Sequence, residues 1–210
     1  MIKVKICGVT NAQDALWAAN LGADYVGLNF YPPSPRKISN RHAKELAAQI
    51  PPFVTLVGIF VDEPIESIAK LVKSVPLRTV QLHGHETPEA CAAARALGVK
   101  VIKAIGVRQP LQPSDVEPYQ DNVDFFLFDN PGDSLPGGTG ETFNWEWLQA
   151  IPFVQKPWFL AGGLNPDNIA DAIKQAHPPA VDVCSGVERL PTRKDYDAMK
   201  RFIQRVKSVR

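Results

Sequence analysis

Cysteine is scarce in this sequence. Only Cys7, Cys91 and Cys184 occur, no two of them form a Cys-X-X-Cys pair, and no histidine stands at the spacing of a zinc ligand. Regular cysteine spacings are what identify disulfide scaffolds and structural zinc sites. We therefore expect three free thiols, and neither a disulfide framework nor a structural metal.

Long hydrophobic runs and an excess of one charge are also missing. The longest largely apolar stretch, residues 53–61, has nine residues, whereas a membrane-spanning helix needs about 20. The 23 Lys and Arg residues nearly balance the 22 Asp and Glu residues, for a net charge of +1. We therefore expect neither a membrane nor a nucleic acid as partner. The first residues resemble a strand and not a signal peptide, which favours a cytoplasmic location.

What the sequence does contain is a repeated alternation of strand-like and helix-like segments. Such alternation is typical of β-α crossover units and a parallel sheet. The strands are expected at residues 2–6, 24–29, 54–60, 79–82, 99–104, 125–128, 158–160 and 181–184. Eight units within residues 1–210 predict a single (β/α)8 TIM barrel that forms one domain, although an open doubly wound sheet also fits the alternation.

Helix signals between the strands are of uneven strength. The first helix is expected to start at Thr10 or Asn11, which suit an N-cap, and to stop at Gly22. Residues 106–122 contain several prolines and are expected to form a loop and a short helix. The Pro- and Gly-rich segment 130–140 is expected to be a loop at the active-site end of the barrel.

Polar residues stand at or just after the expected carboxyl ends of several strands. Cys7 ends the first strand, His83 follows the fourth and Asp129 ends the sixth. In a parallel barrel these ends form one rim, which carries the chemistry. A lone cysteine in a strand is usually a core residue, but at this rim the thiolate of Cys7 could act as a nucleophile or a base. Asp129 either caps the next element or faces a cleft; paired with Cys7 it would be the acid that proton-shuttling isomerisation requires. Cys91, within a helix, and Cys184, within the eighth strand, are expected to be core residues.

Three glycine-rich segments follow strands six, seven and eight in succession. They are GGTG at residues 137–140, AGGL at 161–164 and CSGVE at 184–188. Glycine lets backbone N–H groups approach an anion closely, and the last loops of a barrel often form a phosphate site. Tight turns explain any one of these segments, but three in succession predict phosphate-binding loops after strands six to eight.

Arg36 lies in a loop that contains three prolines, in the segment YPPSPR. Prolines stiffen a loop and reduce the entropy lost when it presents a guanidinium group to a carboxylate. Arg36 is therefore a candidate for substrate binding, although a charged loop residue is more often solvated. His83 has the same two interpretations, as a group lining the site or as a surface residue.

Together, the motifs along the chain closely resemble phosphoribosylanthranilate isomerases. The resemblance spans the whole chain and is carried by KICGVT, FYPPSPR, VGIFVDE, VQLHGHE, GGTGETFNW, LAGGLNPDNI and VDVCSGVE in this order. It implies the Amadori rearrangement of the aminoaldose N-(5′-phosphoribosyl)anthranilate to an aminoketose phosphate in tryptophan biosynthesis. It also implies that neither a cofactor nor a metal takes part.

The resemblance further implies a role for each site residue. Cys7 is the general base at the ribose C2, and Asp129 is the general acid at the furanose ring oxygen. Arg36 binds the anthranilate carboxylate, and Asp182 hydrogen-bonds the sugar hydroxyls. The phosphate is held by backbone amides at Gly162, Gly163, Ser185 and Gly186, beside the turn that contains Gly138 and Gly140.

Two positions depart from the family pattern. Asn130 follows Asp129 where a small hydroxyl residue is usual, which puts the hydrogen bonding of Asp129 in doubt. The segment PTRKD, starting at Pro191, lacks the usual glycine, which puts the start of the last helix in doubt.

Three alternative functions compete with this interpretation. The sugar isomerase of histidine biosynthesis resembles the chain in its phosphate loops, but it uses an aspartate where Cys7 stands. Its substrate also carries two phosphates, and the loops after strands two to four contain no second glycine cluster. A catalytically silent phosphate-binding barrel is the second alternative, and cysteine nucleophilic catalysis, which has no obvious partner residue, is the third. The expected partner is a small phosphosugar, bound by a monomer or a homodimer.

Overall fold

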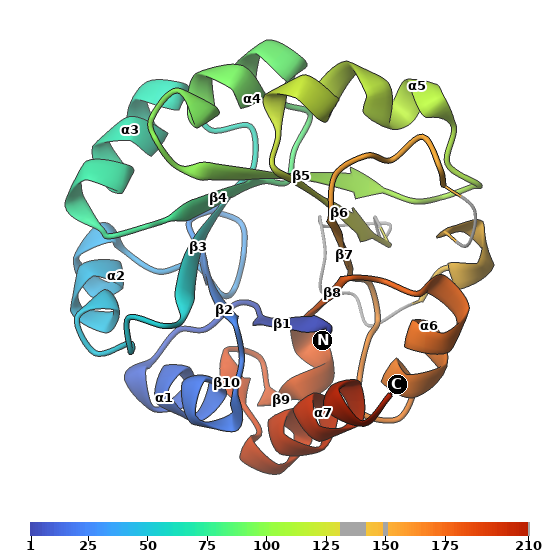
Figure 1. Ribbon diagram of the computed structural model, residues 1–210. Coiled ribbons are helices and arrows are strands. Elements are labelled where there is room, and N and C mark those ends of the chain that lie inside the picture. The colour runs from blue at the N-terminus through green and yellow to red at the C-terminus, as the bar shows by residue number, and fades with distance from the viewer. Residues whose placement is uncertain (131–141, 149–150, 210) are drawn as a thin grey trace.

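Eight parallel strands form a closed barrel in the computed structural model, which describes residues 1–130, 142–148 and 151–209 (Figure 1). The strands are β1 (Lys3–Ile6), β2 (Tyr25–Asn29), β3 (Thr55–Phe60), β4 (Thr79–Leu82), β5 (Lys100–Gly106), β6 (Phe125–Asp129), β7 (Trp158–Leu160) and β8 (Ala180–Val183). Strand β8 pairs with β1 from Lys3↔Ala180 to Ile6↔Val183, which closes the barrel. The predicted (β/α)8 barrel is confirmed, and the open sheet is excluded because an open sheet would leave these two strands as unpaired edges.

Helices surround the barrel between successive strands (Figure 1). They are α1 (Ala12–Leu21), α2 (Asn40–Ala47), α3 (Ile65–Ser74), α4 (Pro88–Arg95), α5 (Pro113–Val116), α6 (Ile169–Ala176) and α7 (Tyr196–Ser208), with short 3₁₀ helices η1 (Glu117–Asn122), η2 (Trp145–Leu148) and η3 (Ser185–Val187). The prediction for residues 106–122 is confirmed, since α5 and η1 follow a loop there. An antiparallel hairpin of β9 (Glu188–Leu190) and β10 (Arg193–Lys194) precedes α7.

Local sequence explains where these helices begin and end. Asn11, one of the two predicted caps, accepts a hydrogen bond from the backbone N–H of Asp14, and Gly22 ends α1 in a left-handed conformation with φ of 94°. At the other end of the chain, Asp195 accepts a hydrogen bond from Ala198 N and caps α7. The last helix therefore starts normally, although the chain lacks the family's glycine after Pro191.

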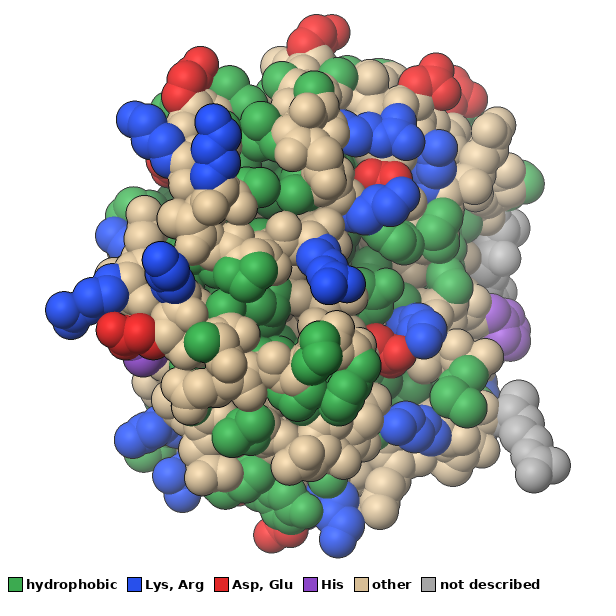
Figure 2. Space-filling view, turned by 60° about the vertical axis from the view of Figure 1, so that its left-hand side comes forward, with side chains coloured by type: hydrophobic (Ala, Val, Ile, Leu, Met, Phe, Trp, Pro, Cys, Tyr) green, Lys and Arg blue, Asp and Glu red, His purple; other side chains and the backbone are tan. Residues whose placement is uncertain are grey.

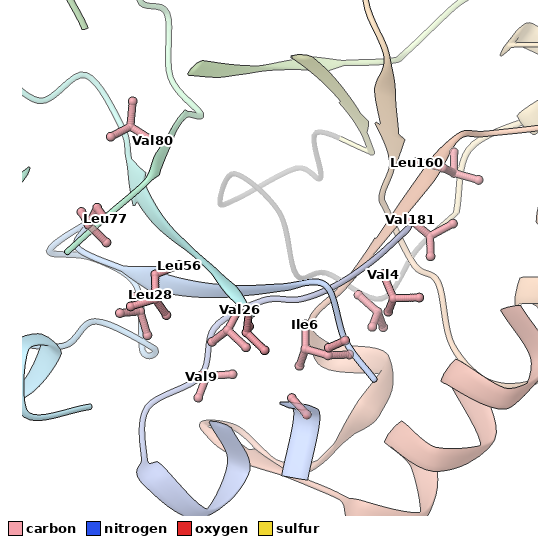
Figure 3. Packing of buried hydrophobic residues seen from close by; sticks show 14 of the residues in the cluster. Val4, Ile6, Val9, Val26, Leu28, Leu56, Leu77, Val80, Leu160 and Val181 are labelled. Atoms are coloured by element: carbon pink, nitrogen blue, oxygen red, sulfur yellow. The ribbon is translucent and has the colours of Figure 1, made fainter. Parts of the chain in front are cut away.

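The main hydrophobic core lies between the barrel and its helices. Figure 3 shows side chains such as Val4, Val26 and Val181 pointing outward from the strands toward the helical layer. A smaller cluster fills the barrel itself and includes Leu127 and Phe159. This division follows from the two-residue period of a strand, which places alternate side chains on opposite sides.

The described surface carries no single concentration of charge on the face drawn in Figure 2. Lys and Arg side chains are spread among hydrophobic and neutral ones there, with acidic groups between them. This distribution agrees with the net charge of +1. Among the described residues, no helix is long and apolar enough to cross a membrane.

Candidate active site

The two-residue period of the strands brings the predicted acid and base to the interior side of one rim. Leu127 belongs to the interior cluster, so Asp129, two residues later, faces the barrel mouth at the end of β6. Lys5 is fully buried inside the barrel, so Cys7, two residues later, faces the mouth beyond β1. Only 5% of Asp129 is exposed, which gives its carboxyl group a largely dry environment.

Asp129 is held by a chain of polar side chains from β4. His83 Nε2 lies 3.3 Å from Asp129 Oδ2, and Gln81 Nε2 lies 2.8 Å from His83 Nδ1. With the Gln81 amide oriented as a donor, Nδ1 accepts and the proton of a neutral imidazole is on Nε2, directed at Asp129. His83, a candidate from the sequence, is therefore a direct neighbour of the candidate acid. Gln81, which contacts His83, was not identified in the sequence.

A buried ion pair supports the base side of the rim. Lys5 Nζ lies 3.0 Å from Asp182 Oδ1, and the two side chains are 0% and 8% exposed. Burial raises the pKa of Asp182, and the positive charge of Lys5 only partly opposes this. Lys5 was not recognised in the sequence, although it stands two residues before Cys7 and so shares the inward face of β1.

The prediction that Cys184 is a core residue within strand eight is wrong. Strand β8 ends at Val183, and Cys184 is only partly buried at the rim. Because Asp182 faces the interior, Cys184 two residues later faces the barrel mouth beside Cys7, and the pKa of each thiol responds first to the other. Cys91, by contrast, is fully buried in α4 as predicted.

The two neighbouring thiols have opposite pKa shifts. The hydrogen bond with Cys184, burial and the negative charge of Asp182 raise the pKa of Cys7 well above its usual value. The hydrogen bond from Cys7, together with the positive charges of Lys194 and Arg36, outweighs burial and lowers the pKa of Cys184 to about 6. The structure thus favours one proton shared by two thiols, with the negative charge on Cys184.

Arg36 is held at the rim by Glu188 of β9. Its Nε and Nη2 atoms donate to the two carboxylate oxygens at 2.8 and 2.7 Å, a bidentate arrangement. Lys194 Nζ, fully buried, lies 3.0 Å from Glu188 Oε1. Burial alone would raise the pKa of Glu188, but the hydrogen bonds from the two cations lower it. Neither Glu188 nor Lys194 was singled out in the sequence, because the ion pair with Arg36 that links Glu188 to the loop after β2 spans 152 residues.

The loops after β7 and β8 meet at the same rim. Gly162 has φ of +84°, and a side chain there would come within 2.5 Å of the backbone N of Asn130. A side chain at Gly186 would collide with the backbone carbonyl of Leu164. Both glycines are therefore required for close loop packing, and Ser185 opens the 3₁₀ helix η3 between the loops. Gly138 and Gly140 lie outside the described residues.

Sequence comparison identifies the family of this chain. The family described as N-(5'phosphoribosyl)anthranilate (PRA) isomerase matches residues 4–205. The chain belongs to the PRA isomerase family. Among PRA isomerases it is 44% identical to that of Acidithiobacillus ferrooxidans over 207 residues, which cover 99% of this chain and 98% of the relative. It is 42% identical to that of Thermotoga maritima over 211 residues, which cover 100% of both chains.

Solved PRA isomerases have the same fold along their whole length. The crystal structure of the Thermotoga maritima isomerase matches with a TM-score of 0.89 and 41% identity, covering 99% of each chain. A PRA isomerase in complex with reduced 1-(o-carboxyphenylamino)-1-deoxyribulose 5-phosphate matches with a TM-score of 0.85 and 40% identity, again covering 99% of each chain. The resemblance seen in the motifs is confirmed. The chain is an isomerase of tryptophan biosynthesis that converts PRA to the corresponding aminoketose phosphate.

Proposed function

We propose that Cys7 and Asp129 carry out the proton transfers of the PRA isomerase reaction, within one catalytic domain formed by residues 1–210. The observation that supports this assignment is their placement at the ends of different strands of one barrel mouth. Asp182 interacts electrostatically with the surroundings of both candidate groups. Its pKa responds to Lys5, which is on the strand that precedes Cys7, and also to Asp129 and His83. An acid and a base that reach a substrate from different strands are what an aldose–ketose isomerisation needs.

The reaction begins at the furanose ring. The carboxyl group of Asp129 donates a proton to the ring oxygen, the bond between C1 and that oxygen breaks, and the lone pair of the anthranilate nitrogen forms a C1=N double bond. The N–H of His83, 3.3 Å from Asp129, stabilises the carboxylate that remains. The open-chain Schiff base then has an acidic proton on C2.

Cys7 acts on this open-chain intermediate. Its sulfur removes the C2 proton, the C–H electron pair forms a C1=C2 double bond, and the electrons of the C1=N bond return to nitrogen. The product is an enolamine, which becomes the aminoketose when C1 gains a proton and the C2 hydroxyl loses one. The proton lost by the hydroxyl replaces the one that Asp129 gave to the ring oxygen. The chemistry assigned here uses side chains alone, without a metal or a cofactor.

Substrate binding is assigned to the groups around this pair. Glu188 occupies Nε and Nη2 of Arg36 and so sets the plane of the guanidinium group; we assign Nη1 to the anthranilate carboxylate. Asp182 binds sugar hydroxyls and His83 lines the site. Backbone amides at Gly162, Gly163, Ser185 and Gly186 hold the phosphate, with Gly138 and Gly140 beside them.

The partners and location of the enzyme belong to the same proposal. The substrate is a phosphosugar, and one solved relative was crystallised with a reduced deoxyribulose phosphate analogue. The enzyme works as a monomer or a homodimer; a solved relative from Thermotoga maritima is described as monomers of a dimeric isomerase. We place the reaction in the cytoplasm, because the substrate is a phosphorylated biosynthetic intermediate.

A fluorescence assay with two substrates tests the proposed function. The purified protein is given PRA in one series and the aminoaldose of histidine biosynthesis in the other. We expect turnover of PRA with natural fluorescence of the anthranilate group as the signal, and little turnover of the second substrate. Turnover of the histidine-pathway substrate alone would favour that isomerase, and turnover of neither would favour the silent phosphate-binding barrel.

A further inference from the structure

We propose that Cys184 is a positioning residue for Cys7: in the resting enzyme it holds the negative charge of the thiol pair, and during catalysis it receives the proton of Cys7. The inference rests on the proposed role of Cys7 as the base. It assigns to Cys184 a function that the family resemblance did not include. Three features support it, namely the geometry of the pair, the charges on the Cys184 side and the charges on the Cys7 side.

The geometry places the two thiols directly beside each other. Ile6 and Val183 are paired in the parallel register of β1 and β8, and Cys7 N donates to Val183 O at 2.9 Å. Cys7 and Cys184 are the next residues after these two paired strands, and the largest cause of each thiol's pKa shift is a hydrogen bond to the other. This adjacency is what a proton transfer between the two thiols requires.

The Cys184 side of the pair has one positive charge in excess. Lys194 Nζ lies 3.9 Å from Cys184 Sγ and donates to Cys184 O at 2.9 Å. The aliphatic part of Arg36 approaches from the opposite loop, against Gly8 and close to Cys184. Both cations share a single carboxylate, that of Glu188. A thiolate on Cys184 neutralises this largely buried group, and burial makes such compensation important.

The Cys7 side has no such excess among the described residues. The positive charge of Lys5 is already matched by Asp182 at 3.0 Å, and Asp129 on β6 faces His83. A thiolate on Cys7 would therefore meet an ion pair that is already balanced, and the negative charge of Asp182 disfavours it. The pKa directions agree: that of Cys7 is raised and that of Cys184 is lowered to about 6.

These charges define how Cys7 becomes a base. As the C2 proton of the Schiff base moves to Cys7 Sγ, the proton already on Cys7 moves to the Cys184 thiolate, and the C–H electron pair forms the C1=C2 bond. Both cysteines are then thiols. The reverse transfer, in which Cys7 donates a proton to C1 of the enolamine and recovers one from Cys184, restores the resting thiol pair.

The first test locates the thiolate without any substrate. The ultraviolet absorbance of thiolates is measured against pH in the wild type and in Cys184→Ser, Cys7→Ser and Cys91→Ser. We expect one thiolate with a midpoint near the value of about 6 in the wild type and in Cys91→Ser. Cys7→Ser should keep a thiolate in the weakly acidic to neutral range, since serine can still donate a hydrogen bond. Cys184→Ser should lose it, with no titration below the usual thiol value of about 8.5.

The opposite result in these two variants, with the thiolate lost in Cys7→Ser and kept in Cys184→Ser, would overturn the proposal. Circular dichroism checks that each variant is folded. Lys194→Gln is a second variant for the case that Cys184→Ser does not fold. It should shift the thiolate midpoint upward because it removes the nearest cation, and an unchanged midpoint would count against the proposal.

The second test is the pH profile of kcat/KM for PRA. In Cys184→Ser the acidic limb should move from near 6 toward about 8.5 or above. A merely structural role would lower the rate equally at all pH values and leave the limb in place, which would reject the relay. The two proposals fail in different ways: near-normal turnover in Cys7→Ser removes Cys7 as the base, whereas the substrate-free titration decides which thiol is ionised and does not depend on turnover.

Discussion

At the scale of single residues, each candidate catalytic group is controlled by a neighbour from another strand. His83 contacts Asp129 across the rim, and Cys184 contacts Cys7. Partners of this kind set orientation and protonation, which decide whether an acid or a base works at neutral pH.

We expect Cys7→Ala and Asp129→Asn each to lower kcat by about a hundredfold or more, the usual effect of losing a general base or acid. The fold should persist, since both side chains lie at the rim. Steady-state kinetics with PRA measures the effect, and Asp121→Asn, at an exposed position on η1, is the matched control. Near-normal turnover in either variant would contradict the assigned proton transfers.

Arg36→Ala is expected to act mainly on substrate binding. The variant removes the group assigned to the anthranilate carboxylate, so KM for PRA should rise while kcat changes less. Arg41→Ala, whose side chain is 90% exposed on α2, should leave KM unchanged. If KM for PRA does not change in Arg36→Ala, Arg36 does not bind the substrate.

At the scale of elements, the site depends on two loops that lie unusually close together. The loop after β7 and the start of η3 after β8 meet where Gly186 contacts the backbone of Leu164. Main-chain atoms cannot move aside as a flexible side chain does, so the spacing of the assigned phosphate amides depends on the absence of a Cβ atom here.

Gly186→Ala should therefore weaken phosphate binding and raise KM for PRA. Gly98→Ala is the control. A Cβ atom at Gly98 would meet no other atom, but the φ of Gly98 is +82°, so this substitution adds backbone strain without a collision. It should lose about 1–2 kcal/mol of stability from backbone strain alone, with normal kinetics. Kinetics and thermal unfolding of both variants separate the effects; equal KM values in the two would show that Gly186 does not shape the phosphate site.

At the scale of the whole molecule, Glu188 joins segments that are far apart in the chain. It binds Arg36 in the loop after β2 and Lys194 in β10, and all three side chains are largely buried. Removal of one charge from a buried cluster leaves the others uncompensated, which commonly costs about 3–5 kcal/mol. The cluster therefore contributes to the site and also to the stability of the folded protein, since it joins the loop after β2 to the β9–β10 hairpin.

We expect Glu188→Gln to be less stable than the wild type by about 3–5 kcal/mol near neutral pH. The pKa of Glu188 is lowered in the folded state. Its contribution is therefore complete above the ordinary value of 4.5 and is lost as the pH falls through the lower, folded value. Urea unfolding at neutral and at strongly acidic pH should show a difference that shrinks with acid. A pH-independent difference would argue against the charge as its cause.

Glu45→Gln is the matched control for this experiment. Glu45 is 58% exposed and pairs with Arg41 on the surface of α2. Exposed ion pairs contribute little because water screens them, so the change in stability should stay below about 1 kcal/mol.

The sequence by itself determined the alternation of eight strands and helices, and hence the barrel and its rim. Strand ends were located to within a residue or two because apolar periodicity and turn residues act locally. The same local information placed Cys7, His83 and Asp129 at or just after the carboxyl ends of their strands. It failed at Cys184, because a cysteine at the end of an apolar run fits a core strand as well as a rim.

Only the tertiary structure decided the partners of these groups. Glu188 reaches Arg36 across 152 residues of chain, and Lys5 reaches Asp182 across 177. Such contacts depend on the closure of β1 against β8, and charge balance is a property of the resulting cluster and not of any segment. The tertiary structure therefore also sets the protonation of the Cys7–Cys184 pair. The two cysteines, and the charged groups around them, lie near opposite ends of the chain and meet only when the barrel closes.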